Sequence, residues 1–154
     1  MTRIPKSFLD LSNLKTLILN NNKIEKIENL SNLNFLEKLE MRGNKIEKVE
    51  NLENNKNLIT LTLSSNLIKE INDNNFPILE KVEEFGIFGN YIGDDSDISN
   101  NYSIFKKTIQ IIVKSFPKIK EIYIGGNFIS QIPNFHNEIK TLIPSIQSID
   151  GHKM

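Results

Sequence analysis

The sequence predicts an α/β solenoid in which short parallel strands stack side by side, and two observations support this fold class. First, a nine-residue pattern of apolar residues ending in asparagine occurs five times, and its first three asparagines lie 22 residues apart. Second, apolar and polar residues alternate within each copy, as in a strand with one face turned inwards. One such unit cannot bury its apolar face alone, so the units must stack around a shared core.

The five copies define the expected strands. Three are regular and two are irregular: Leu14-Leu17-Leu19-Asn22, Leu36-Leu39-Met41-Asn44, Leu58-Leu61-Leu63-Asn66, Val82-Phe85-Ile87-Asn90 and Ile119-Ile122-Ile124-Asn127. We expect one domain, residues 1–154, with a partial first repeat at 1–13, five repeats over 14–133 and a C-terminal cap at 134–154. An insertion is expected at about 93–116.

The segments between the strands carry apolar residues at a spacing of three, as in Ile24, Ile27 and Leu30. This spacing predicts short 3₁₀ or helical turns on the convex side of a curved right-handed coil, with the parallel sheet on the concave side. The repeated asparagines are expected to stack as a ladder that hydrogen-bonds the turn backbone, with ligand binding as the alternative. They are Asn22, Asn44, Asn66, Asn90 and Asn127.

The interval from Asn90 to Asn127 is longer than the others and predicts an inserted helix. Apolar residues from Ile104 to Phe116 recur at helical spacing, which favours three to four turns on the convex side. The acidic run 94–97 is suited to capping the start of that helix. A calcium loop is the alternative, but the glycine at its sixth position and the acid at its twelfth are missing.

The chain begins in the middle of a repeat, because Ile4, Phe8 and Leu11 match the return half of a coil. An uncovered end of a solenoid exposes apolar core and a free strand edge. Two interpretations stay open: the array is part of a longer one, or the N-terminal edge meets another chain, including a second copy.

The repeats resemble leucine-rich repeats, specifically the short class of about 22 residues found in the leucine-rich regulatory subunit of protein phosphatase one. The coil from Asn22 to Met41 carries this resemblance. The run from Asn134 to Gly151 is similar to the cap of acidic nuclear phosphoproteins, the spliceosomal A-prime protein and the leucine-rich axonemal dynein light chain. Residues 101–116 faintly resemble the same cap. The resemblance implies a module that binds other proteins.

Strand residues between the core positions are expected to point into the concave face and to bind a protein partner. The candidates are Ile18, Lys38, Glu40, Arg42, Thr62, Glu84, Phe88, Glu121 and Tyr123. Tyrosine and arginine are favoured at interaction hot spots, although isolated exposed apolar residues are also ordinary. A row after the ladder asparagines, Leu67, Tyr91 and Phe128, is expected either to form a rim patch or to cover loop backbone.

Composition excludes several other classes of function. Lys plus Arg and Asp plus Glu both total 19, so no charge excess indicates direct nucleic-acid binding, and no apolar run is long enough for a membrane helix. Without cysteine, a disulfide framework and a cysteine-based zinc site are excluded, which fits an intracellular protein of the cytoplasm or nucleus. No phosphate loop is present, and neither His136 nor His152 has a catalytic partner at diagnostic spacing.

The sequence therefore predicts no catalytic residue, no metal site and no cofactor. It favours a non-catalytic interaction module, either a regulatory or a scaffold subunit, that holds a protein partner on the concave face. Two alternatives remain: a scaffold in an RNA-processing nucleoprotein, or a structural segment of a larger repeat protein. The glycosylation patterns at Asn29 and Asn101 are interpreted as chance matches in an asparagine-rich chain.

Overall fold

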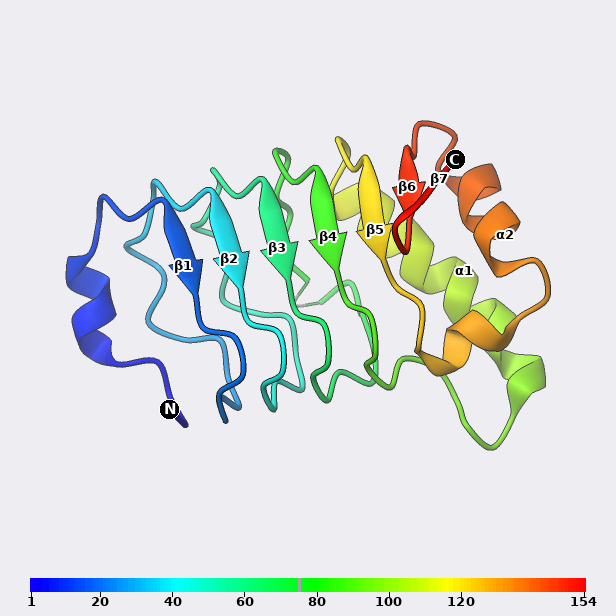
Figure 1. Cartoon of the computed structure of the whole chain (residues 1–154), viewed down its shortest axis with the longest axis horizontal. Helices are drawn as coiled ribbons and strands as arrows, with labels where there is room; N and C mark the ends of the chain where they lie inside the picture. Colours follow the sequence, from blue (N-terminus) through cyan, green and yellow to red (C-terminus); the bar gives the residue numbers. More distant parts are fainter. Residues whose placement is uncertain (75) are drawn as a thin grey trace.

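In a computed structural model, which describes residues 1–74 and 76–154, the strands form one sheet in chain order (Figure 1). The described strands are β1 (Thr16–Ile18), β2 (Lys38–Glu40), β3 (Thr60–Thr62), β4 (Glu84–Gly86), β5 (Glu121–Tyr123), β6 (Ser148–Ile149) and β7 (His152–Lys153). Strands β1 to β6 are parallel, and β7 pairs antiparallel with β6. The predicted α/β solenoid is confirmed.

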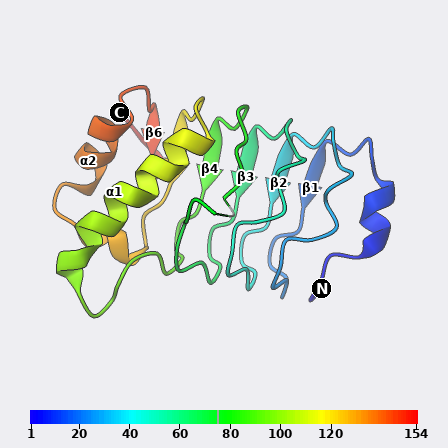
Figure 2. The ribbon, with the colours of Figure 1, turned by 180° about the vertical axis from the view of Figure 1, so that it is seen from behind.

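The described residues also form four helical segments: η1 (Lys6–Asp10), α1 (Ile98–Ser115), η2 (Phe128–Gln131) and α2 (Phe135–Leu142). Helix α1 lies behind the sheet, and α2 lies beside it at the C-terminal end (Figure 2). The sequence therefore predicted the inserted helix correctly. It predicted three to four turns, which is too short, because the 18 residues of α1 make about five turns. The helix starts early because the Asp97 side chain accepts a hydrogen bond from the Ser99 amide at 3.0 Å.

The core is a continuous ribbon between the sheet and the return segments. Strand pairing aligns Leu17, Leu39, Leu61, Phe85 and Ile122 in one inward row, and the most exposed of them, Leu17, shows only 8% of its surface. Where α1 replaces a short return, three aromatic rings fill the wider space. Phe116 lies 4.9 Å from Phe85 and 5.3 Å from Phe76 between ring centroids.

The prediction of short helical turns in the returns is only partly correct. Residues 23–35 and 45–57 contain isolated i→i+3 hydrogen bonds, such as Leu33 N–H to the Leu30 carbonyl at 3.0 Å, but no helix. Among the described residues, 3₁₀ helices occur at η1 and η2. Residues 1–14 also cover the first coil better than expected, because Ile4, Leu17 and Leu19 are all buried.

The terminal cap differs from its prediction in one respect. Asp150 and Gly151 do not simply end the last strand, because they form the two-residue turn between β6 and β7. Both have positive φ, 51° and 82°, as a type I′ hairpin turn requires. The Asp150 carboxylate also accepts hydrogen bonds from the amides of Ile124 and Gly125, at 2.8 and 2.9 Å, and so joins the cap to the end of β5.

The ladder asparagines connect each coil to the one before it. The Asn66 amide nitrogen donates to the Leu63 carbonyl of its own coil and to the Met41 carbonyl of the preceding coil, at 2.9 and 3.0 Å. Its carbonyl oxygen accepts from Ile46 N–H at 2.9 Å. Asn44, Asn90 and Asn127 make the equivalent bonds. One side chain therefore satisfies three backbone groups at each turn.

The residue before each ladder asparagine adopts a left-handed backbone conformation. The five residues and their φ angles are Asn21 (56°), Gly43 (68°), Ser65 (55°), Gly89 (64°) and Gly126 (68°). Glycine occupies three of these positions because it enters this region without a Cβ clash. The Gly-Asn pairs were visible in the sequence, but the repeat pattern alone does not show that the turn needs positive φ.

Replacing Asn66 with alanine is expected to lower the free energy of unfolding by about 3 kcal/mol, because it leaves three backbone groups without partners. Urea unfolding followed by circular dichroism measures this. Asn22 is the matched control, since it is half-buried and water can replace its bonds. Asn22→Ala should cost about 1 kcal/mol. If both variants lost the same free energy of unfolding, the effect would not come from the hydrogen bonds that Asn66 makes to buried backbone groups.

Replacing Ser65 with glycine should raise the free energy of unfolding by about 1 kcal/mol, because the strain of a left-handed serine exceeds the added chain entropy of glycine. Thermal or urea unfolding provides the measurement. Ser65→Ala is the control, since alanine keeps the strain and should give no gain. If the glycine variant is less stable, the Ser65 side chain contributes more to stability than its left-handed backbone conformation costs.

Candidate functional site

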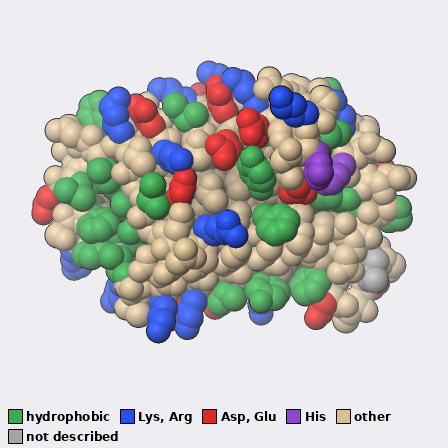
Figure 3. All heavy atoms as spheres, viewed as in Figure 1, with side chains coloured by type: hydrophobic (Ala, Val, Ile, Leu, Met, Phe, Trp, Pro, Cys, Tyr) green, Lys and Arg blue, Asp and Glu red, His purple; other side chains and the backbone are tan. Residues whose placement is uncertain are grey.

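The structure places the predicted partner-binding residues on the outward face of the sheet, which is here the concave face. Strand register arranges this face in three columns: Thr16, Lys38, Thr60, Glu84 and Glu121; Ile18, Glu40, Thr62, Gly86 and Tyr123; and Asn20, Arg42, Ser64, Phe88 and Gly125. Side chains at these positions point away from the core because neighbouring residues on a strand face opposite sides. Charged and hydrophobic groups alternate across the face (Figure 3).

The N-terminal half of the face carries a local charge network. Lys38 pairs with Glu40 at 2.7 Å, and the Asn20 amide donates to the same carboxylate at 2.8 Å. The Lys38 and Asn20 hydrogen bonds lower the pKa of Glu40, while the bond to Glu40 raises the pKa of Lys38. Arg42 is exposed, and no ion pair of its guanidinium occurs within the described part of the chain.

The C-terminal half of the face is acidic. Glu84 and Glu121 are register partners on adjacent strands, so two like charges lie side by side. The Thr60 hydroxyl donates to Glu84 at 3.3 Å, and the Tyr123 hydroxyl lies 3.4 Å from Glu121. Burial is the main cause of the raised pKa of Tyr123, and the charges of Glu121 and Glu84 add to it.

Phe88 rises from this face beside a floor of small residues. Its ring lies against Gly125 and Gly126, where an added Cβ would come within 3.3 Å of the ring in both cases. The ring is nevertheless 47% exposed. Gly86 adds to the low floor, because it has no side chain between Thr62 and Tyr123 in the central column. The sequence predicted that Phe88 is exposed, but not that glycines of the next coil support it.

The three rim residues lie together outside the concave face. Tyr91 and Phe128 have ring centroids 6.2 Å apart, and Tyr91 is 46% exposed. With Leu67 they border a hollow of about 560 Å³. Hydrophobic side chains gather along the lower edge of the molecule, over the loops that follow the strands (Figure 3). The rim residues therefore lie beside an open space.

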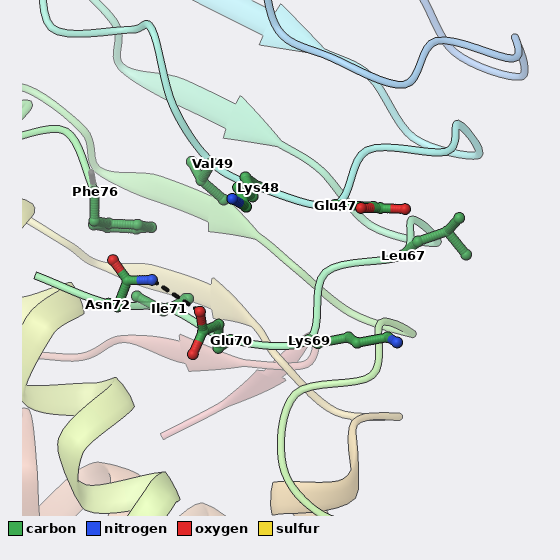
Figure 4. Close-up of a pocket in the computed structure, with 9 residues that line it drawn as sticks. All are labelled: Glu47, Lys48, Val49, Leu67, Lys69, Glu70, Ile71, Asn72 and Phe76. Atoms are coloured by element: carbon green, nitrogen blue, oxygen red, sulfur yellow. Dashed lines mark hydrogen bonds between the residues drawn. The ribbon is translucent and has the colours of Figure 1, made fainter. Parts of the chain in front are cut away.

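A second hollow, of about 310 Å³, lies between two return segments and was missed by sequence reasoning. Val49, Ile71 and Phe76 supply apolar side chains to it, and Asn72 donates to Glu70 at 3.0 Å at its border (Figure 4). The coil from Asn66 to Asn90 has two residues more than the two coils before it. The two extra residues were the signal in the sequence for this hollow. They lengthen the return before Phe76, which takes in its coil the core position that Leu52 takes in the coil before.

The remaining polar clusters have structural partners. His136 lies 3.2 Å from Asp150, which also holds the end of β5, and Glu83 pairs with Lys120 at 2.8 Å. In the acidic run, Asp94 accepts bonds from Ser96, which lower its pKa. Over residues 1–74 and 76–154, no three acidic or histidine side chains converge as a metal site would require.

The two glycosylation patterns fall on engaged asparagines. The Asn29 amide donates to the Ile4 carbonyl at 2.7 Å, and Asn101 is fully buried and bonded to the backbone of Asp94. Attaching a glycan to either nitrogen would break these contacts. Among the described helices, none is long and apolar enough to cross a bilayer.

These features define an α/β solenoid of short stacked repeats. Residues 12–54 match the family described as Leucine Rich repeats (2 copies). A comparison with curated protein sequences finds no match.

Solved structures share the fold at low sequence identity. A chain of the Drosophila melanogaster SNF/U2A' complex superposes with a TM-score of 0.75 at 21% identity, covering 100% of this chain and 86% of that one. An internalin (inlF) from Listeria monocytogenes gives 0.72 at 21% identity, covering 100% of this chain and 39% of that one. A leucine-rich repeat protein of Leptospira interrogans gives 0.60 at 19%, covering 96% and 40%.

Replacing Lys38 with methionine should raise the pKa of Glu40 towards its ordinary value, because the largest cause of its depression is removed. Carbon-detected NMR titration of the carboxylate measures this. Because the folded pKa is depressed, the linked stability is present above pH 4.5 and is lost as pH falls through the folded pKa. The variant should lose the larger part of this pH dependence, since the Asn20 hydrogen bond remains, and an unchanged Glu40 titration would contradict the pairing.

Proposed function

We propose that the chain is a non-catalytic interaction module, a regulatory or scaffold subunit, that binds a protein partner on the concave face. Proteins with leucine-rich repeats generally mediate protein–protein interaction, which supports this class of function. The observation that carries the proposal is Phe88, an aromatic ring 47% exposed on a polar sheet. Its support by Gly125 and Gly126 fixes the ring where a partner can cover it.

The neighbouring groups are suited to recognition by a partner protein. Tyr123 lies next to Gly86 in the central column, and Arg42 lies in the same column as Phe88, two coils before it. Both residue types are favoured at hot spots. Glu84 and Glu121 repel each other in the free chain, so a partner cation between them would relieve that repulsion. The central contacts would then be apolar, with charged groups around them setting orientation.

A scaffold role in an RNA-processing nucleoprotein is the second candidate. The observation in its favour is the fold match to a chain of the SNF/U2A' complex, which covers all of this chain and 86% of the other. In this alternative the module holds an RNA-binding protein and does not itself contact RNA. The likeness of the first repeats to the regulatory subunit of protein phosphatase one supports phosphatase regulation as a further form of the same proposal.

Affinity purification from the source cell, followed by mass spectrometry, tests the concave site. The variant Phe88→Ala with Tyr123→Ala should lose a protein that the unchanged chain retains, because the two aromatic contacts are removed without touching the inward row.

The control is Phe35→Ala, since Phe35 is 55% exposed and lies outside the three columns. This variant should retain the partner. An identical set of bound proteins for all three chains would refute the concave site. Nuclease treatment that removes every bound protein would instead show that RNA is the direct ligand.

A further inference from the structure

A strip of exposed and half-buried side chains follows the edge of the solenoid, outside the concave face. It consists of the residues that directly follow the ladder asparagines: Lys23, Lys45, Leu67, Tyr91 and Phe128. Backbone bonds hold successive members in line, since the amides of Lys45, Leu67 and Tyr91 each donate to the preceding coil at 2.8 to 2.9 Å. We call this row the rim strip.

The apolar half of the rim strip borders an open trough. Leu67, Tyr91 and Phe128 line the 560 Å³ hollow together with Gly93 and Asp95. Gly93 has a φ of 112°, and a Cβ there would lie 2.6 Å from the Asn101 carbonyl oxygen, so only glycine fits. This close packing of Gly93 against Asn101 and Ile129 holds in place the loop that borders the trough.

Opposite charges lie at the two ends of the rim strip. Lys23 and Lys45 are exposed at the N-terminal end, while the acidic loop 94–97 lies at the other end, with Asp95 on the trough. Figure 3 shows basic, then hydrophobic, then acidic side chains along this lower edge. Glu47 and Lys69 line the middle and offset each other. The strip thus has a direction, which a partner of complementary charge order would recognise.

We propose that the rim strip docks an amphipathic helix of a protein partner, with its acidic first turn over the lysines and its basic last turn over the loop 94–97. A helix advances about 5.4 Å per turn and the coils repeat about every 4.8 Å, so one apolar side chain per turn meets one coil. An extended strand repeats about every 6.6 Å on one face and loses this match. The orientation also follows the helix dipole, which favours acids at the N-terminus.

A synthetic peptide tests this inference directly. Five coils span about 20 Å, which a helix covers in about 13 residues. The probe has glutamates in its first turn, leucines on one face at i, i+4 and i+7, and lysines in its last turn. Fluorescence anisotropy measures its affinity, and ¹⁵N NMR maps the bound surface. We expect saturable binding with shifts at Leu67, Tyr91 and Phe128.

Two substitutions define the expected contacts. Tyr91→Ala should weaken the affinity about tenfold, because an exposed aromatic anchor is removed. A triple variant, Lys23→Glu, Lys45→Glu and Asp95→Lys, should weaken it further and should instead prefer a peptide whose charged ends are exchanged. A preference of the triple variant for the exchanged peptide would show that the charges of the rim strip set the orientation of the bound helix.

The controls separate this surface from the concave one. Phe35→Ala and Phe88→Ala should leave peptide affinity unchanged, because neither residue lines the trough. The inference is overturned if Tyr91→Ala binds as tightly as the unchanged chain, or if both charge orders bind equally well. It is also overturned if Phe88→Ala alone abolishes binding, since the peptide would then lie on the concave face.

Discussion

The buried turn after each strand is the constraint on which this structure depends. Backbone groups there face no water, and a side-chain amide can both donate and accept in the same place. Each ladder asparagine meets this need for its own coil and for the one before it, as Asn66 does with Leu63, Met41 and Ile46. Coils that share hydrogen bonds in this way stack in a constant register, and the apolar ribbon forms behind them.

Constant register also explains why function is expected on lines of residues. A position that recurs in every coil becomes a column on the surface, so a change at one coil alters one point of that column. Gly86 lowers the concave floor, and Phe88 stands above it because Gly125 lies one coil further on. The rim strip follows the same logic, changing from lysine to apolar residues between Lys45 and Leu67.

Much of the fold could be predicted because its determinants are local and repeated. Alternation of apolar and polar residues assigned Leu39 to the core and Glu40 to the surface, and the structure places both accordingly. The capping acids of α1 were predicted, but its full length and the hairpin at Asp150 were not, because neither follows from the periodic apolar pattern. The hollow beside Phe76 depends on how two returns of different length pack.

The sequence by itself determined the solenoid, the positions of its first five strands and the outward columns, because a repeated pattern of burial allows few other arrangements. Only the tertiary structure decided what lies next to what across coils. It set Phe88 on the glycines of the following coil, formed the trough beside Tyr91 and Phe128, and brought the loop 94–97 to the end of the rim strip. These contacts join residues from coils of unequal length, and the spacing within any single coil does not encode them.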